Sequence, residues 1–363
     1  MINNKIKLLL LSDPSSPHTI RWANALHNKG IEIYLFGLST YNKKDYDPAI
    51  KIETMHTPGW IKIRFNGSLL KIIYLFKLPR LRRIIRKFKP DVLHAHYVSS
   101  YGILGALTNF HPFFISAWGI DIFLFPGVSP LHKGLVKFAL KKADKIFSTS
   151  NVMAGETKKY TTKEIQVVPF GIDPDKFYPS AQNKNDTGEI KIGLVKSLER
   201  KYGIDKLINT FELLKSRNPN LKLKLLLIGG GSLEDKFKKM VKSKGLEQNT
   251  IFTGNISHQF ISDYHRKLDI AVYLSTSESF GVSVIESSAC EIPVVVSDAG
   301  GLVEVVENNK TGFVISKGDP NEACKAIELL IRDKDLRIRM GKLGRKRGLE
   351  LYNWLVMEDP ILP

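Results

Sequence analysis

Short apolar runs alternate with helical patterns along almost the whole chain, and this alternation constrains the fold more than any other feature. Apolar runs such as KIKLLLLS (5–12), DVLHAHY (91–97) and PFFISAW (112–118) are separated by segments with helical spacing. Strands that alternate with helices form right-handed crossover units and a parallel sheet. The sequence therefore predicts an α/β protein.

The alternation stops once, over a segment rich in proline, glycine and polar residues at 171–189, and then resumes. Such a composition is typical of a linker. We predict two Rossmann-like, doubly wound parallel-sheet domains, an N-terminal one over 1–170 and a C-terminal one over 190–345. Because ligands of open α/β sheets bind beyond the carboxyl ends of the strands, we expect the two domains to face a cleft. Residues 346–363 are expected to form a short tail.

Composition excludes several classes of protein. Hydrophobic residues make up 43% of the chain and charged residues 25%, which is typical of a soluble globular protein. Two cysteines are too few for a disulfide framework and indicate a reducing compartment. No apolar run reaches the roughly 18–20 residues of a membrane span, and the N-terminal MINNKIKLLLLS is interpreted as a buried first strand, not a leader. We therefore expect a cytoplasmic protein.

The positive charge of the chain is unevenly distributed. The chain has 54 Lys and Arg against 36 Asp and Glu, a net charge of +18. Residues 1–180 carry 26 basic and 12 acidic side chains, whereas residues 181–363 carry 28 and 24. A one-sided basic field points to an anionic partner such as a membrane surface, a nucleic acid or a phosphorylated substrate.

The densest part of this field is the segment KIIYLFKLPRLRRIIRKFKP, residues 71–90. It has eight Lys and Arg and no acidic residue, and apolar residues are interleaved with the basic ones. A basic amphipathic helix of this kind can lie on an anionic membrane, with Pro79 kinking or splitting it. The alternative is an ordinary Rossmann helix whose apolar face is core, and the two interpretations are compatible.

The segment 277–286, SESFGVSVIE, follows an apolar run and opens a helix. Gly281 lets the backbone approach a ligand closely, and the first amides of the helix suit a phosphate. Glu278 and Glu286 flank this turn, and a carboxylate beside a phosphate is favourable when it accepts hydrogen bonds from neutral hydroxyls. The pattern predicts a nucleotide-sugar, with ribose, diphosphate and hexose in that order. The alternative is that both glutamates merely face solvent near a helix start.

At this point the sequence resembles a known family. The segment 278–315 is similar to family 4 of the retaining GT-B glycosyltransferases (glycosyl transferases group 1), whose signature is Glu, seven residues, Glu. Further landmarks of the family match PDVLHAHY (90–97), ADKIFSTS (143–150), VVPFGIDPDKFYP (167–179) and LLLIGGGS (225–232). The resemblance therefore extends over nearly the whole chain.

The resemblance implies transfer of a hexose or N-acetylhexosamine from a UDP- or GDP-sugar to an acceptor hydroxyl, with retention of configuration and without a metal or other cofactor. It implies a role in cell-surface polysaccharide, lipopolysaccharide or lipid-linked glycan synthesis, with a glycan or lipid-linked acceptor. Carried over by position, Glu278 contacts the transferred sugar and acts in catalysis, and Glu286 binds the ribose. The donor contacts between them fall on Phe280, Gly281, Val282 and Ser283.

Relatives neutralise the leaving diphosphate with an Arg and a Lys at the start of the second domain. Here the corresponding stretch, GLVKSLERKYGIDKLI (193–208), departs from the common form. Lys196 and Lys201 are the candidates for the two catalytic cations, with Arg200 in reserve. The alternative is a solvated basic loop.

In the first domain, the resemblance implies binding of the acceptor. Pro17-His18-Thr19 replaces a common Gly-Gly turn, and alternation places His94 and His96 on one strand face. A His-Gly-x-Asp motif of many relatives reads Trp118-Gly119-Ile120-Asp121 here, so a role of that histidine does not transfer. The acceptor-binding candidates are His18, His96, Trp118 and Asp121.

Other functions remain as alternatives. The chain could bind a nucleotide-sugar without transferring it, and we hypothesise that the crossing helix that follows an aromatic-Trp pair in relatives is truncated here. It could be a basic protein of anionic surfaces or nucleic acids, although no RNP-like aromatic strand or zinc spacing is present, so no nucleic-acid partner is expected. A GT-B epimerase or phosphorylase is disfavoured because the signature is that of transferases. Our preferred location is peripheral, at the inner face of the membrane.

Overall fold

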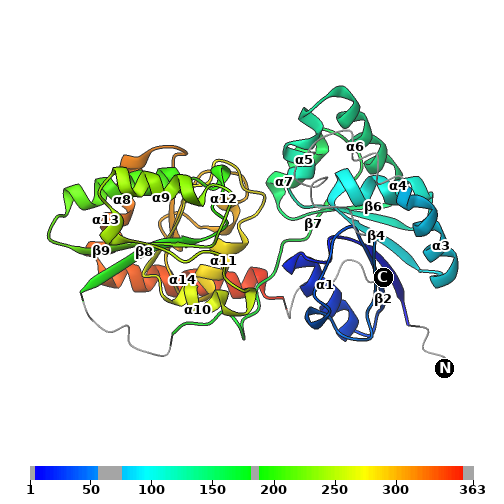
Figure 1. Cartoon of the computed structure of the whole chain (residues 1–363), viewed down its shortest axis with the longest axis horizontal. Coiled ribbons are helices and arrows are strands. Elements are labelled where there is room, and N and C mark those ends of the chain that lie inside the picture. The colour runs from blue at the N-terminus through cyan, green and yellow to red at the C-terminus, as the bar shows by residue number, and fades with distance from the viewer. Residues whose placement is uncertain (1–4, 56–75, 181–187, 355–363) are drawn as a thin grey trace. The chain divides into compact units, whose positions relative to one another are not determined.

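The computed structural model describes residues 5–55, 76–180 and 188–354. It divides into two compact units, Met1–Val168 and Pro169–Pro363. Each unit contains one sheet in which every neighbouring pair of strands is parallel, with helices packed against it (Figure 1). The predicted α/β class with two Rossmann-like units is confirmed.

The sheet of the first unit has seven strands in the order β3-β2-β1-β4-β5-β6-β7. The order reverses between β1 and β4, which is the switch point of a doubly wound sheet. Its strands are β1 (Lys7–Leu11), β2 (Glu32–Gly37), β3 (Lys51–Thr54), β4 (Val92–His96), β5 (Phe113–Ala117), β6 (Lys145–Ser148) and β7 (Gln166–Val167).

The described helices of the first unit join consecutive strands. They are α1 (Pro17–Asn28), α3 (Leu78–Phe88), α4 (Ile103–Thr108), α5 (Ile120–Phe123), α6 (Pro130–Lys142) and α7 (Asn151–Lys158). A π-helix, η3 (Tyr97–Gly102), leads from β4 into α4. Tyr97 has a left-handed backbone, with φ of 70°, which is uncommon for a bulky residue. This strain lies where the chain leaves the switch-point strand.

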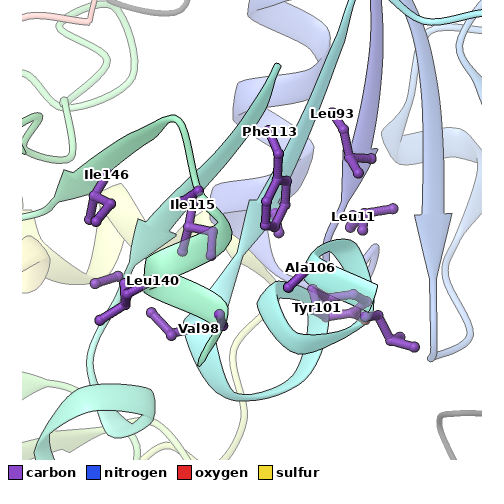
Figure 2. Packing of buried hydrophobic residues seen from close by; sticks show 14 of the residues in the cluster. Leu11, Leu93, Val98, Tyr101, Ala106, Phe113, Ile115, Leu140 and Ile146 are labelled. Atoms are coloured by element: carbon purple, nitrogen blue, oxygen red, sulfur yellow. The ribbon is translucent and has the colours of Figure 1, made fainter. Parts of the chain in front are cut away.

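The core of the first unit lies between the sheet and the helices α3, α4 and α6. Leu11, Leu93 and Ile115 project from neighbouring strands toward Tyr101 and Leu140 of the covering segments (Figure 2). All five residues of β5 are buried, as expected for a central parallel strand. The burial makes the carboxyl ends of β1, β4 and β5 a rigid platform for the loops that follow them.

The sheet of the second unit has six strands in the order β10-β9-β8-β11-β12-β13, with the reversal between β8 and β11. Helices α8, α9 and α13 cover one face and α10, α11 and α14 the other (Figure 1). The strands are β8 (Glu189–Val195), β9 (Lys222–Ile228), β10 (Thr250–Phe252), β11 (Ile270–Tyr273), β12 (Val294–Ser297) and β13 (Gly312–Ile315). The helices are α8 (Ile204–Arg217), α9 (Glu234–Ser243), α10 (Ile261–Arg266), α11 (Val282–Ala289), α12 (Leu302–Val305), α13 (Pro320–Arg332) and α14 (Lys334–Tyr352).

The structure differs from the predicted boundaries at two places. The expected linker begins inside the second unit, because Phe177 is fully buried and Ile172 bridges to Asn353 at the end of α14. The expected tail from residue 346 is helical as far as Tyr352, since it continues α14. The residues beyond Trp354 lie outside the described part of the chain.

The basic segment 71–90 is described from residue 76. Pro79 lies in the first turn of α3, where a missing N–H costs no helical hydrogen bond, so the helix begins there and is not kinked by it. The buried stripe of α3 consists of Leu81, Ile84 and Phe88. The apolar face is thus core while the basic residues remain outside, as the compatible interpretation predicts.

Candidate functional site

Two loops meet at the switch point of the second unit because β8 and β11 are neighbouring strands. Their parallel register pairs Ile270 with Ile192 and Ala271 with Gly193. Lys196 directly follows β8, and Glu278 lies in the loop that connects β11 to α11. Strand pairing therefore brings together two residues that are far apart in the sequence.

Lys196 and Glu278 form an ion pair at this point. Nζ of Lys196 lies 2.8 Å from Oε2 of Glu278, and the side chains are 15% and 12% exposed. Burial alone would lower the pKa of the Lys196 ammonium, but the nearby Glu278 carboxylate and Tyr202 outweigh it and raise that pKa. Lys196 is therefore charged at neutral pH, as a partner for an anion must be.

Tyr202 joins the two predicted cations. Nζ of Lys196 lies 4.4 Å from the centre of the Tyr202 ring and Nζ of Lys201 lies 4.8 Å from it, which are cation–π distances. The backbone of Lys201 is held as well, because its carbonyl accepts a hydrogen bond of 2.8 Å from the amide of Thr276. The basic loop is thus anchored to the glutamate loop, unlike a freely solvated one, whereas Arg200 is exposed.

The helix α11 begins beside this ion pair. Gly281 has a left-handed backbone, with φ of 113°, and the amides of Gly281, Val282 and Ser283 have no recorded acceptor in the described residues. The loop before the helix is packed tightly, because a Cβ on Gly300 would lie 2.0 Å from the carbonyl oxygen of Glu278. The arrangement presents amide donors and a positive helix end next to Lys196.

Glu286 lies one turn inside α11 and is 6% exposed. Oε2 of Glu286 lies 3.5 Å from Nε2 of the fully buried His265 of α10. The other ring nitrogen of His265 is 2.9 Å from Oγ of Ser287, which in turn lies 2.9 Å from the hydroxyl of Tyr273. Burial raises the pKa of Tyr273, so this hydroxyl remains neutral. A buried polar network therefore supports the second glutamate.

Phe280 has a different environment from its neighbours in the loop. Its side chain is 2% exposed, and its ring lies 6.3 Å from that of Phe170 and 5.2 Å from that of Tyr352. The predicted donor contact of Phe280 is therefore restricted to its backbone, because its ring belongs to the core of the second unit.

In the first unit, aromatic side chains gather around Trp118. The ring of His96 lies 4.1 Å from the Trp118 ring at an interplanar angle of 32°, and the rings of Tyr97 and His18 approach edge-on at 5.1 and 5.9 Å. His96 ends β4 and Trp118 follows β5, and these strands are neighbours. Three of the four predicted acceptor residues are therefore brought together.

The two histidines of β4 lie on one face of the strand, as alternation predicts, with ring centres 4.8 Å apart. Nδ1 of His96 lies 2.9 Å from Oγ of Ser12, and Nε2 of His94 lies 2.8 Å from Oγ of Ser116. Burial lowers the pKa of His94 to about 3, and burial together with the other histidines lowers that of His96 well below its ordinary value. Both rings are neutral at pH 7 and fully buried, so His96 packs against Trp118 and its predicted acceptor contact has no accessible surface.

Asp121 is a positioning residue and not an exposed ligand contact. It is 1% exposed, and its carboxylate accepts backbone hydrogen bonds of 2.7 Å from Val98 and 2.7 Å from Gly119. Burial raises the pKa of Asp121, although these N–H donors oppose the shift. The carboxylate ties the start of η3 to the turn that carries Trp118, so the predicted acceptor contact of Asp121 has no accessible surface.

The predicted donor residues thus converge on one switch point and the predicted acceptor residues on the other. Sequence reasoning missed Tyr202 and His265, because neither belongs to a recognisable motif. Within the described ranges, no group of three His, Cys, Asp or Glu side chains is placed to hold a metal ion. The described helices also include none with the length and apolarity to cross a membrane.

The sequence matches two families of known proteins. Residues 177–347 match the family described as glycosyl transferases group 1, and residues 7–150 match the family described as glycosyl transferase 4-like. The first match spans the ion pair and both flanking glutamates, and the second spans the Trp118 cluster.

Individual relatives are similar over nearly the whole chain. A capsular polysaccharide biosynthesis glycosyltransferase of Staphylococcus aureus is 26% identical over 96% of this chain and 93% of its own length. Sucrose-phosphate synthase of Thermosynechococcus elongatus has a TM-score of 0.81 at 21% identity, covering 97% of this chain and 96% of that one. The Anabaena protein HepE, crystallised with UDP and glucose, has a TM-score of 0.76 at 17% identity, covering 96% of both chains. The structural likenesses show a shared fold.

Proposed function

This chain belongs to the glycosyl transferases group 1 and is a glycosyltransferase of GT-B fold, and we propose that it transfers a hexose or N-acetylhexosamine from a UDP- or GDP-sugar with retention of configuration and without a metal. The observation that carries this proposal is the ion pair of Lys196 and Glu278, which lies beside the open amides of α11. A cation, a carboxylate and free amides in one place suit a sugar diphosphate.

In this proposal the diphosphate binds the amides of Gly281, Val282 and Ser283, and Glu286 accepts hydrogen bonds from the ribose hydroxyls. The diphosphate competes with Glu278 for Lys196. Because the donor draws the ammonium away, Glu278 becomes free to accept a hydroxyl of the transferred sugar. The ion pair thus holds both groups in place before the donor arrives.

During transfer, negative charge grows on the leaving diphosphate as the anomeric bond breaks. Lys196 and Lys201 stabilise that charge, and Tyr202 holds both ammonium groups where it develops. The leaving phosphate takes the proton of the acceptor hydroxyl on the same face of the sugar, so Glu278 is not required as a nucleophile. The Trp118 cluster forms an apolar wall for the acceptor.

The acceptor is proposed to be a glycan or a lipid-linked glycan at the inner face of the membrane. The capsule-forming relative supports a cell-surface polysaccharide or lipopolysaccharide. The outer face of α3 supports the location, because Arg82, Arg83 and Arg86 are exposed and an anionic surface attracts such residues. Neither cysteine forms a disulfide, which fits the cytoplasmic side.

The donor proposal is tested by thermal unfolding with UDP-, GDP-, ADP- and CMP-sugars in EDTA, comparing the native chain with Glu286→Gln. A donor at 100 times its dissociation constant stabilises by about 2.7 kcal/mol, which gives a clear rise in Tm. We expect a rise with one nucleotide class, its loss in Glu286→Gln, and its retention in Glu350→Gln, a surface control on α14. No rise with any donor would contradict the proposal.

Transfer itself distinguishes the enzyme from a protein that only binds the donor. The donor class that raises Tm is incubated with membrane lipid extract, and the product is examined by NMR for its anomeric configuration. We expect a product with the donor's configuration, formed equally in EDTA. Binding without product would favour the non-transferring alternative, and an inverted product would exclude retention.

A further inference from the structure

A hollow in the first unit lies at the amino ends of the strands, whereas the Trp118 cluster lies at their carboxyl ends. Its volume is about 370 Å³, within the range of small-ligand sites. Lys7, Glu32 and Lys51, which line it, are the first residues of β1, β2 and β3. Because the strands are parallel, their amino ends all lie on one side of the sheet and their carboxyl ends on the other. This hollow is therefore separate from the residues proposed for the transfer reaction.

The hollow has more cations than its carboxylates can neutralise. Glu32 accepts a hydrogen bond of 2.9 Å from Nζ of Lys51, and Glu53 accepts one of 2.9 Å from Nη2 of Arg80. Both acidic residues of the lining are therefore already paired. Three lining cations, Lys7, Arg83 and Lys87, remain without a carboxylate within 4 Å among the residues that the structure describes.

The three unpaired cations line the same hollow. Arg83 and Lys87 are one turn apart on α3, where like charges at this spacing destabilise a helix. Nζ of Lys7 lies 6.0 Å from the centre of the Phe88 ring, and Nζ of Lys51 lies 5.8 Å from it. Two ammonium groups therefore lie near the same ring. A bound anion would relieve this repulsion.

The lining of the hollow also contains two aromatic side chains, Tyr34 and Phe88. The rings of Tyr34 and Phe88 lie 5.3 Å apart, and the Tyr34 hydroxyl donates to Glu53 over 2.9 Å. Aromatic and cationic side chains in one lining suit a ligand with a phosphate and a small organic part. The guanidinium of Arg83 can bind two phosphate oxygens at once, and the lysines add point charge.

We propose that this hollow binds the phosphate group of an organic phosphate, supplied either by an anionic phospholipid headgroup or by a soluble phosphate ester. The proposal goes beyond the transfer reaction. It adds a discrete site to the general attraction of α3 to a membrane, and it holds whichever donor the second unit takes.

The test compares two double variants of the full chain that lose the same charge. Arg83→Gln/Lys87→Gln removes two lining cations, and Arg86→Gln/Lys137→Gln removes one Arg and one Lys that are exposed on the same unit outside the lining. Binding is measured by cosedimentation with phosphatidylcholine vesicles containing phosphatidylglycerol. General attraction to an anionic surface contributes about fivefold per cation, so loss of the discrete site should weaken binding of the lining variant by more than the roughly 30-fold that two such cations account for.

The control variant should lose markedly less affinity than the lining variant, since its cations make only the general contact. A soluble arm measures the Tm of each protein with sn-glycerol 3-phosphate. A rise that only the lining variant loses, without a vesicle difference, would assign the site to a soluble ester, and a vesicle difference alone would assign it to a headgroup. Equal losses in both double variants, or no response to either probe, would overturn the proposal.

Discussion

Nζ of Lys196 lies 2.8 Å from Oε2 of Glu278, across the switch point between β8 and β11. The pair is largely buried, so neither charge is well solvated when its partner is removed. A single change at either residue therefore affects both the stability of the folded protein and the proposed reaction, and the two effects have to be separated experimentally.

Replacing Lys196 with Met should reduce kcat roughly 10²–10³-fold, as removal of one preorganised charge-stabilising group does in other enzymes. The physical reason is that the leaving diphosphate loses its nearest cation. Steady-state kinetics with the identified donor measures this change. Lys236→Met, an exposed lysine of α9, is the control and should keep native kinetics. Equal kcat in both variants would contradict the role of Lys196.

The same pair predicts a pH dependence of stability. The pKa of Lys196 is raised in the folded protein by Glu278 and Tyr202 despite its burial. Its contribution is therefore fully present below the unfolded pKa of about 10.4 and is lost as pH rises through the folded value. The Tm difference between the native chain and Lys196→Met should be constant from pH 7 to 9 and should shrink above pH 10.

Gly300→Ala should displace the glutamate loop. A Cβ at this position would lie 2.0 Å from the carbonyl oxygen of Glu278, and φ is 56°. Gly245→Ala is a matched control, because its φ is 66° but nothing lies within 4 Å of the added atom. Both variants should lose about 1–2 kcal/mol of stability from the left-handed backbone. We expect further destabilisation and a loss of transfer activity of more than tenfold only in Gly300→Ala.

The comparison of these variants is made by urea unfolding and by transfer assay on the same preparations. If Gly245→Ala loses as much activity as Gly300→Ala, backbone strain alone accounts for the loss. The close approach of Gly300 to Glu278 would then have no functional importance.

The sequence predicted the fold well because strand and helix periodicities are local signals. The two unpredicted strands, β3 and β7, have only four and two residues, too few to show a period. Glu278 and Glu286 were predicted as site residues for the same reason, since they flank one helix start. Tyr202 and His265 were not found, because their proximity to the site comes from the pairing of β8 with β11 and the packing of α10 on α11.

The buried histidines of β4 predict a loss of stability in acid. Burial lowers the pKa of His94 to about 3 in the folded protein, against about 6.5 in the unfolded chain. Below pH 6.5 the unfolded chain therefore binds a proton that the folded protein does not. Stability should fall by about 1.4 kcal/mol per pH unit for this residue between pH 6.5 and 3.

His94→Gln tests this prediction, because the amide can keep the hydrogen bond to Ser116 without titrating. The dependence of the unfolding free energy on pH, measured from 6.5 to 4.5, should be shallower by about one proton than in the native chain. An unchanged slope in His94→Gln would show that His94 is protonated in the folded protein.

His265 should act on donor binding through Glu286. Its Nε2 lies 3.5 Å from Oε2 of Glu286, while its Nδ1 lies 2.9 Å from Oγ of Ser287. An asparagine reproduces the position of Nδ1 and a glutamine that of Nε2. His265→Asn should therefore raise the donor KM about tenfold, the effect of losing about 1.4 kcal/mol of polar contact to the glutamate, with kcat little changed. The donor KM of His265→Gln should be closer to the native value than that of His265→Asn.

The Asn and Gln variants separate positioning from packing, because both lose the ring that packs 5.8 Å from Phe177. A role confined to packing would lower Tm in both variants and leave both KM values alike. A positioning role splits the KM values while the two Tm values fall together. Donor titration and thermal unfolding of the pair therefore decide whether the buried histidine sets the orientation of the glutamate or only fills the space behind it.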